Sequence, residues 1–279
     1  MIEQNTPSIM NCNAFWNFHL GSWDGRWTRY QPSGESLETF FSCRTFESDI
    51  DKKIINQFNR YVYQDGKIGE KNWSYSLENH CKKDGFMHPA SDYMRGLAFE
   101  DGAAAWLVPQ ALPEQYFPME LFLANKNVRF SVGMLYGLNG DLQRTACIRE
   151  QRRDFDNSAW SKSMQLVPAW NIGSHWHGIT FIIGADLGRT MVHETFNMTP
   201  EADHKEYFFP DNIILRCPAK LNLHKQFTIS GIWLESENQL KTITSSYGKN
   251  SKLIDVRLQH LSRLIFSHSS FNQIFIMSC

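Results

Sequence analysis

The sequence predicts an all-β protein that consists of two antiparallel β-barrels in tandem, preceded by a short N-terminal helix. Short runs of alternating apolar and polar residues recur along most of the 279-residue chain, separated by Gly, Pro, Asn or Asp. Aromatic residues make up 14% of the chain, and their rings pack well on pleated sheets. The alternation lapses once, after residue 150, and then restarts. We therefore expect two β-domains rather than one.

Residues 7–20 are predicted to form the N-terminal helix. Ser8 is placed to cap its first turn, and Phe15, Trp16 and Phe18 would form its apolar side. Helical patterns are sparse after this segment, so the rest of the chain is expected to be strands and turns.

The first barrel is expected within residues 1–150. About nine strands follow one another with short turns, which favours an up-and-down antiparallel barrel. Asn139-Gly140 is a strong hairpin signal between the last two strands. The predicted strands are Gly25–Tyr30, Leu37–Phe46, Ile54–Tyr63, Trp73–Leu77, Leu97–Phe99, Ala103–Leu107, Met119–Leu123, Val128–Tyr136 and Leu142–Glu150.

A polar linker is expected over 151–170, and a second, smaller barrel over 171–279. The linker begins with the charged run QRRDFDNSAWSKSMQ, which has no strand alternation. The second barrel repeats the pattern of the first with fewer strands. Its predicted strands are Trp176–Ile183, Arg189–Phe196, a short one at Phe208-Phe209, Asn212–Cys217, Phe227–Leu234, Leu240–Tyr247 and Leu253–Leu258.

Both halves begin with a glycine closely followed by a tryptophan and end with an arginine in a late strand. We expect Trp23 to plug one end of the first barrel and Arg149 to lie on its indole face as a cation–π lid. Trp176 and Arg257 are expected to play the same two roles in the second barrel. These parallels favour two related barrels.

The segment NAFWNFHLGSWDGRWTRYQPSGE and the later block FFPDNIILRCPAKL…FTISGIWLES resemble the two-domain family called domain of unknown function 3598. This family lies within the lipocalin and fatty-acid-binding superfamily and occurs largely in cyanobacteria and photosynthetic eukaryotes. The resemblance covers residues 13 to about 258 and implies two lipocalin-like barrels. It implies no activity and no catalytic residues. The stretch QHLSRLIFSHSSFNQIFIMSC departs from the family's closing strand, which puts closure of the second barrel in doubt.

Composition and motifs argue against several classes of function. The net charge of −1 lacks the basic excess of a nucleic-acid-binding protein. The N-terminus has no secretory signal, and no apolar run is long enough to span a membrane. The six cysteines are far apart, which predicts free thiols and a cytoplasmic location. The absence of glycine-rich phosphate-binding motifs argues against nucleotide cofactors, and we expect no cofactor.

Several aromatic and arginine residues lie on predicted strands where alternation could point them into a cavity. Rings with one or two arginines suit an amphipathic ligand, such as a fatty acid, an apocarotenoid or a linear tetrapyrrole. Ordinary core packing is the alternative for each ring. The candidate ligand-binding residues are Trp27, Arg29, Tyr61, Tyr63, Arg95, Trp106 and Tyr136.

Metal and acid–base chemistry have weaker signals. His175 and His177 share one face of a strand, and folding the hairpin about Asp186 places His193 opposite residue 179. No fourth ligand is evident, so we predict no metal site. Carboxylates that could act as general acids are scattered: Asp24, Glu47, Asp92, Glu100, Asp101, Glu120 and Glu194.

We therefore predict a cytoplasmic protein that binds a hydrophobic or amphipathic small molecule in a barrel cavity. A cofactor-free cyclase or isomerase, or an enzyme resembling a bilin lyase, is the alternative, because preorganisation alone can catalyse such reactions without a motif. A structural module with two filled barrels and a protein partner is the third possibility. A homo-oligomer also remains open.

Overall fold

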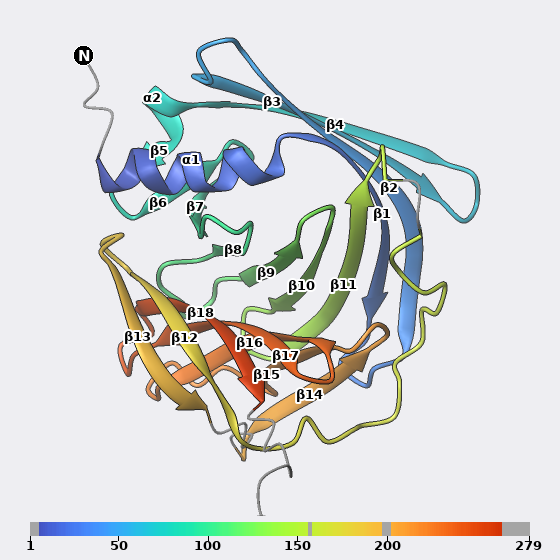
Figure 1. Cartoon of the computed structure of the whole chain (residues 1–279), viewed down its shortest axis with the longest axis vertical. Coiled ribbons are helices and arrows are strands. Elements are labelled where there is room, and N and C mark those ends of the chain that lie inside the picture. Colours follow the sequence, from blue (N-terminus) through green and yellow to red (C-terminus); the bar gives the residue numbers. More distant parts are fainter. Residues whose placement is uncertain (1–5, 156–157, 197–201, 264–279) are drawn as a thin grey trace, which may run out of the picture.

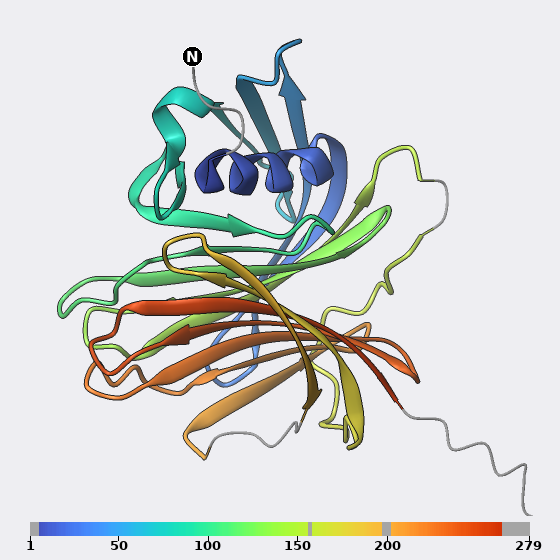
Figure 2. The ribbon, with the colours of Figure 1, turned by 60° about the vertical axis from the view of Figure 1, so that its left-hand side comes forward.

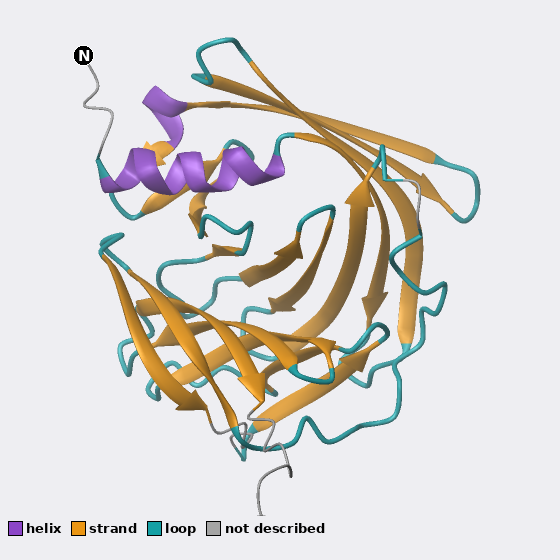
Figure 3. Cartoon of the chain, viewed as in Figure 1, coloured by secondary structure: helices purple, strands orange, loops and turns teal. Residues whose placement is uncertain are grey.

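A computed structural model describes residues 6–155, 158–196 and 202–263 of the protein (Figure 1). Two helices and eighteen strands lie within these residues, and strands are the predominant secondary structure (Figure 3). The strands form two antiparallel sheets of eleven and seven strands. The all-β prediction with a short N-terminal helix is confirmed.

The N-terminal helix α1 (Pro7–His19) matches its predicted position, but its cap differs. The Thr6 hydroxyl, rather than that of Ser8, accepts the first-turn hydrogen bond, from the backbone N–H of Ile9. Pro7 opens the helix, because proline suits the first helical position, and the residue before it becomes the cap. The helix buries Phe15 and Trp16 against the first sheet. In the part of the chain that the structure describes, no helix is long and apolar enough to cross a membrane.

The eleven-stranded sheet curls into a nearly closed barrel whose two edge strands are joined by the short helix α2 (Leu77–His80). Its strands, in spatial order, are β4 (Ile68–Ser76), β3 (Ile54–Tyr63), β2 (Ser36–Ser48), β1 (Gly21–Tyr30), β11 (Leu142–Arg152), β10 (Val128–Tyr136), β9 (Phe117–Asn125), β8 (Ala104–Leu107), β7 (Ser91–Ala98), β6 (Gly85–His88) and β5 (Cys81–Lys82). Helix α1 packs against β5, β6 and β7 (Figure 2).

The seven-stranded sheet is open, so the prediction of a second closed barrel is wrong. Its strands, in spatial order, are β13 (Arg189–Phe196), β12 (Trp176–Gly184), β18 (Leu253–Arg263), β17 (Gln239–Tyr247), β16 (Phe227–Ser236), β15 (Ile213–Pro218) and β14 (His204–Phe209).

The second sheet has the topology of seven of the eleven strands of the first. Its strand order corresponds to β2-β1-β11-β10-β9-β8-β7 of the barrel. In the barrel, residues 49–90 lie between the corresponding outer strands and supply β3 to β6. In the second sheet only residues 197–203 lie between β13 and β14, too few to supply the missing strands. Of the C-terminal stretch that departs from the family, residues 264–279 lie outside the described residues; β18 pairs with β12 as far as Arg263 and with β17 as far as Ser262.

The two sheets pack face to face and share the largest hydrophobic core (Figure 2). Every second residue of β9 and β10 points towards the second sheet. Leu121 and Val132, for example, lie in one hydrophobic core with Ile229 and Ile243 of that sheet. The other face of β9 and β10 lines the barrel interior. The barrel interior is therefore separated from solvent by two layers of sheet on that side. The domain boundaries at 150 and 170 remain a prediction.

Candidate functional site

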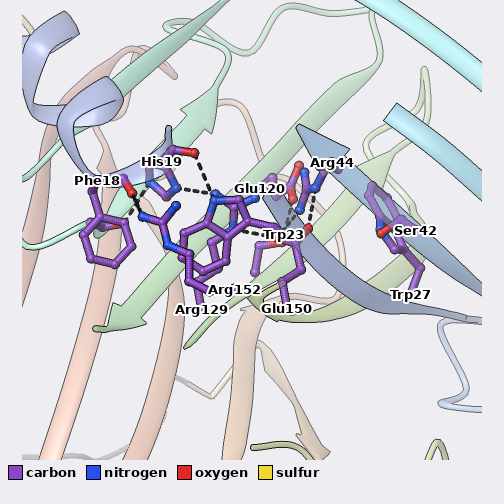
Figure 4. A network of polar contacts seen from close by, with 12 residues as sticks. Phe18, His19, Trp23, Trp27, Ser42, Arg44, Glu120, Arg129, Glu150 and Arg152 are labelled. Carbon is purple, nitrogen blue, oxygen red and sulfur yellow. Dashed lines mark hydrogen bonds and ion pairs between the residues drawn. The ribbon is translucent and has the colours of Figure 1, made fainter. Parts of the chain in front are cut away.

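One end of the barrel is built around Trp23, whose indole is fully buried. Its Nε1 donates a hydrogen bond to the carbonyl of His19, the last residue of α1, at 3.0 Å. Gly21 allows the chain to turn there, because its φ of +98° favours glycine. The guanidinium carbons of Arg129 and Arg152 lie 4.1 and 4.0 Å from the indole centroid (Figure 4).

The predicted partner of Trp23, Arg149, lies elsewhere, and this prediction is corrected. Side chains alternate along β11, and Trp23 pairs with Arg152, so Arg149 faces the opposite side of the sheet. There its guanidinium pairs with Asp211 of the second sheet's connecting loop and donates to the carbonyl of Ser163 at 2.5 Å. Arg149 therefore fastens the linker and the second sheet to the barrel.

The second sheet has a similar arrangement with a different arginine from the one predicted. Trp176 is buried, and the guanidinium carbon of Arg263 lies 4.6 Å from its ring centroid. Arg257 pairs with Ile182 across the sheet, six residues away from Trp176, which is about 20 Å along a strand. Arg257 instead forms an ion pair with Asp255 at 3.0 Å.

Beside Trp23, the barrel interior holds an ionic cluster that the strand pattern did not reveal. Glu150 of β11 is completely buried and accepts hydrogen bonds from Arg44 of β2 at 2.5 Å and from Arg129 of β10 at 2.7 Å (Figure 4). Arg129 also donates to Nδ1 of His19, whose Nε2 contacts the carbonyl of Gly102 at 3.1 Å. We call Arg44, Arg129 and Glu150 the buried triad.

Gly25 makes room for this triad. A Cβ atom at this position would lie 2.6 Å from Cγ of Glu150 and 3.2 Å from the Ser42 hydroxyl. The second glycine of the GSWDG segment is therefore a point of close approach rather than a turn.

Burial and mutual charge interactions shift the pKa values of the triad residues and of His19. Burial alone would raise the pKa of Glu150, but the charges of Arg129 and Arg44 and their hydrogen bonds hold that pKa below its usual value. Burial lowers the pKa of Arg129 to about 10. Burial, followed by the charge of Arg129, holds the pKa of His19 well below its usual value, so His19 is neutral and accepts from Arg129. With two arginines and one carboxylate, the triad carries one net positive charge.

A cavity of about 290 Å³ adjoins the triad inside the barrel. Arg44 and Arg129 form part of its wall, together with Gln57, Asn59, Ser91 and Glu120. The rest of the wall is mostly aromatic. These rings are Phe15, Phe46, Phe122, Trp27, Trp73, Trp106, Tyr61, Tyr75 and His88.

Three of the seven predicted ligand-binding residues, Trp27, Tyr61 and Trp106, line this cavity. Trp27 donates from Nε1 to the Ser42 hydroxyl at 2.8 Å, and the guanidinium carbon of Arg44 lies 5.3 Å from its ring centroid. Their role in binding remains a prediction.

The other four predicted residues do not line the cavity. Arg29 forms an ion pair with Glu38, and Tyr63 packs on Phe40 two residues beyond Tyr61. Arg95 has the opposite alternation to the cavity-lining Met94 and pairs with Asp84. Tyr136 faces the second sheet, where its hydroxyl donates to the carbonyl of Pro218 at 2.8 Å.

The second sheet provides an internal comparison for the triad. The pairs Trp23–Arg152 and Trp176–Arg263 align the two sheets. In this alignment Glu150 corresponds to Leu261, and Arg129 corresponds to Leu240. Both leucines are buried beside Trp176 in an apolar cluster.

The same alignment matches the cavity residue Glu120 with Ser230, and Trp27 with Thr180. The shared topology thus forms with apolar or small residues at these positions. The charges at these positions are therefore not required by the strand order that the two sheets share.

The predicted histidine register is confirmed, since His193 pairs with Ile179. His175 and His193 are exposed and His177 is half-buried. Within residues 6–155, 158–196 and 202–263, no group of three or more His, Cys, Asp or Glu side chains could hold a metal ion.

Comparison with one solved structure agrees with the fold. A crystal structure of a DUF3598 family protein of unknown function from Nostoc punctiforme has a TM-score of 0.71 at 17% identity, covering 91% of this chain and 99% of that chain. An S-type phycobiliprotein lyase from Guillardia theta has a TM-score of 0.36 at 12% identity, covering 55% of this chain and 96% of that chain. A search of curated proteins found no match. Residues 9–155 match the family model described as domain of unknown function (DUF3598), N-terminal, so the chain belongs to the DUF3598 family.

Proposed function

We propose that this protein binds a hydrophobic or amphipathic small molecule in the cavity of its first barrel. The observation that carries the proposal is the combination of an aromatic cavity with a buried triad, two of whose members, Arg129 and Glu150, correspond to leucines in the second sheet. Buried charges cost stability unless they are well paired. A feature that is costly and that the shared strand order does not require is best explained by a ligand.

The volume of the cavity limits the size of the ligand. Ligand pockets usually range from about 300 to 1,000 Å³, and 290 Å³ lies at the small end. This volume suits a ring-bearing isoprenoid or a short polyene chain better than a linear tetrapyrrole. Stacking on Trp27, Trp73 or Trp106 would hold the apolar part.

The triad favours an oxygen-bearing group at one end of the ligand. Arg129 is 1% exposed, and its Nη2 has no hydrogen-bond partner among the described residues. A carboxylate or carbonyl oxygen near the triad would satisfy this donor.

The proposal is tested with two probes, the polyene carboxylate cis-parinaric acid and the isoprenoid ketone β-ionone. Tryptophan fluorescence quenching should show saturable one-to-one binding of at least one of them. Tyr61→Leu should weaken that binding about tenfold, or about 1.4 kcal/mol. Tyr63→Leu is the matched control, because it lies on the same strand outside the cavity wall. The absence of binding by both probes, or equal effects of the two variants, would overturn the proposal.

We also propose a cytoplasmic location. The cysteines in the described part of the chain, Cys12, Cys43, Cys81, Cys147 and Cys217, are free thiols, as expected in a reducing compartment. Cys279 lies outside the described residues. Free thiols would be alkylated rapidly in cells, and the protein would then be unfolded, reduced and labelled at the thiols that reduction releases. Labelling at this second step would reveal oxidised cysteines and contradict the proposal.

A further inference from the structure

We infer that Glu120 and Tyr61 form a proton-transfer site in the barrel cavity that moves a carbon–carbon double bond of a bound unsaturated ketone. This inference rests on the proposed function, because it requires that the cavity accept a ligand. It adds an activity and a substrate class to the binding of an amphipathic molecule.

Glu120 has a fixed carboxyl oxygen and a free one. It lies on β9 and lines the cavity. The Ser131 hydroxyl donates to Oε1 of Glu120 at 2.5 Å, and Oε2 has no hydrogen-bond partner in the described part of the chain. The side chain is half-buried although its neighbour Leu121 is completely buried. Its remaining accessible surface faces the cavity, where a ligand would reach Oε2.

The surroundings make Glu120 a stronger base than a carboxylate in water. Burial raises its pKa above the ordinary value, and the charge of Glu150 acts in the same direction. The charge of Arg44 and the Ser131 hydrogen bond oppose this rise without cancelling it. A carboxyl group with a raised pKa both accepts and returns a proton more readily near neutral pH.

Tyr61 supplies a hydroxyl proton that no group among the described residues accepts. A directed chain of hydrogen bonds runs along the inner face of β3 and β4. Tyr75 donates to Gln57 at 2.7 Å, Gln57 donates to Asn59 at 2.9 Å, and Asn59 donates to the Tyr61 oxygen at 2.7 Å. Because Tyr61 is the acceptor at the end of this chain, its own O–H remains free to donate into the cavity.

A basic carboxylate and a free O–H donor in one aromatic cavity suit proton abstraction next to a conjugated carbonyl. The same two kinds of group act together in enzymes that isomerise ketones. The second sheet has Ser230 at the position of Glu120 and has no strand corresponding to β3. The pair is therefore confined to the cavity-bearing barrel.

The reaction is a proton shift that needs no oxidant, reductant or second substrate. Glu120 as a carboxylate removes a proton from the carbon between an enone and an isolated double bond. The electron pair of the broken C–H bond delocalises to the carbonyl oxygen, which accepts the Tyr61 hydrogen bond as negative charge develops. The Glu120 carboxylic acid then returns the proton to the far carbon of the former double bond. The product is a conjugated isomer, and both residues return to their starting states.

The probe is α-ionone, whose ring double bond lies out of conjugation and which would become β-ionone. Conversion is followed by ultraviolet absorbance and chromatography, and binding of both ionones is followed by tryptophan fluorescence. The full-length protein should convert α-ionone faster than buffer alone, and reactions in D₂O should place deuterium in the product. Glu120→Gln should lower the conversion rate about a hundredfold or more, with binding changed less than about threefold.

Tyr61→Phe should also bind α-ionone and lower the rate about a hundredfold. Glu70→Gln, on the exposed outer face of β4, is the matched control and should convert α-ionone as the unchanged protein does. If the ionones bind but α-ionone is not converted, or if Glu120→Gln converts it equally fast, the inference is wrong and the proposed function stands. If cis-parinaric acid binds and neither ionone does, the ketone class is wrong. If no probe binds, both the inference and the proposed function fail.

Discussion

Replacing Glu150 by glutamine should destabilise the protein strongly. The substitution keeps the shape of the side chain but removes the negative charge that lies between Arg44 and Arg129. Glu150 is completely buried, so no water can replace the lost charge. Removing one partner of a buried ion pair typically costs about 3–5 kcal/mol. We expect a loss of this size in the free energy of unfolding.

Equilibrium unfolding in urea, followed by tryptophan fluorescence, measures this loss. The control is Glu206→Gln, which removes a carboxylate from the 2.6 Å Arg216–Glu206 pair, whose members are 11% and 26% exposed. This more accessible pair should contribute less than about 1 kcal/mol. A loss below about 1 kcal/mol for Glu150→Gln would refute the reasoning that the triad is electrostatically coupled and shielded from water.

A triple variant extends the same prediction. Arg44→Met, Arg129→Leu and Glu150→Leu together replace all three charges, and two of the new residues are those that the second sheet has at the matching positions. Apolar replacement of a complete buried ionic group is often neutral or stabilising. The acceptor at Nδ1 of His19 would lose its donor, which costs about 1–3 kcal/mol. We expect the triple variant to be more stable than Glu150→Gln alone.

Three further predictions concern the surroundings of the triad. Gly25→Ala should cost about 1–3 kcal/mol in urea unfolding, because its Cβ would overlap Glu150; an unchanged midpoint would contradict this. Trp27→Ala should weaken probe binding with little loss of stability, since Trp27 is half-buried on the cavity wall, and a loss of about 3–5 kcal/mol would instead mark it as a core residue. Burial, followed by the charge of His80, lowers the pKa of His88 to about 4. The unfolded chain therefore binds a proton at His88 at a higher pH than the folded protein does, and stability is lost as the pH falls from about 6.5 towards 4. The raised pKa of Glu120 has the opposite effect on the pH dependence of stability. The slope of unfolding free energy against pH is therefore compared between the wild-type protein and His88→Gln from about pH 7 to 5, and equal slopes would contradict the prediction.

The strand pattern was sufficient to predict the overall class of the protein and part of the cavity wall. Alternation correctly indicated most strands, and the helix was placed within one residue at its C-terminal end. The alternation did not reveal the strands within residues 78–96. The short strands β5 to β7 carry few apolar residues there and pair only with their neighbours in sequence. The openness of the second sheet could have been inferred from the short segment 197–203, because seven residues cannot supply four strands.

The triad was missed because one sequence does not show which charges share an interior. Arg44, Arg129 and Glu150 are separated by many residues, and only strand register brings them together. A signal was nevertheless present. Arg44 lies two residues from the buried Phe46, and Glu150 lies two residues from the buried Ile148, so each charge shares a face of its strand with a buried apolar residue. A solvent-facing charge is not expected at such a position. Opposite charges at inward positions of several strands indicate a buried ionic group.

The most direct test of the account compares the binding of cis-parinaric acid by the wild-type protein and by the triple variant of Arg44, Arg129 and Glu150. Both proteins must first show cooperative unfolding in urea, which establishes that they are folded. The account predicts that the folded triple variant binds cis-parinaric acid at least about tenfold more weakly, or about 1.4 kcal/mol, because the net positive charge and the free Nη2 donor are gone. Equal affinity of the two folded proteins would contradict the claim that the buried charges of the barrel serve a ligand.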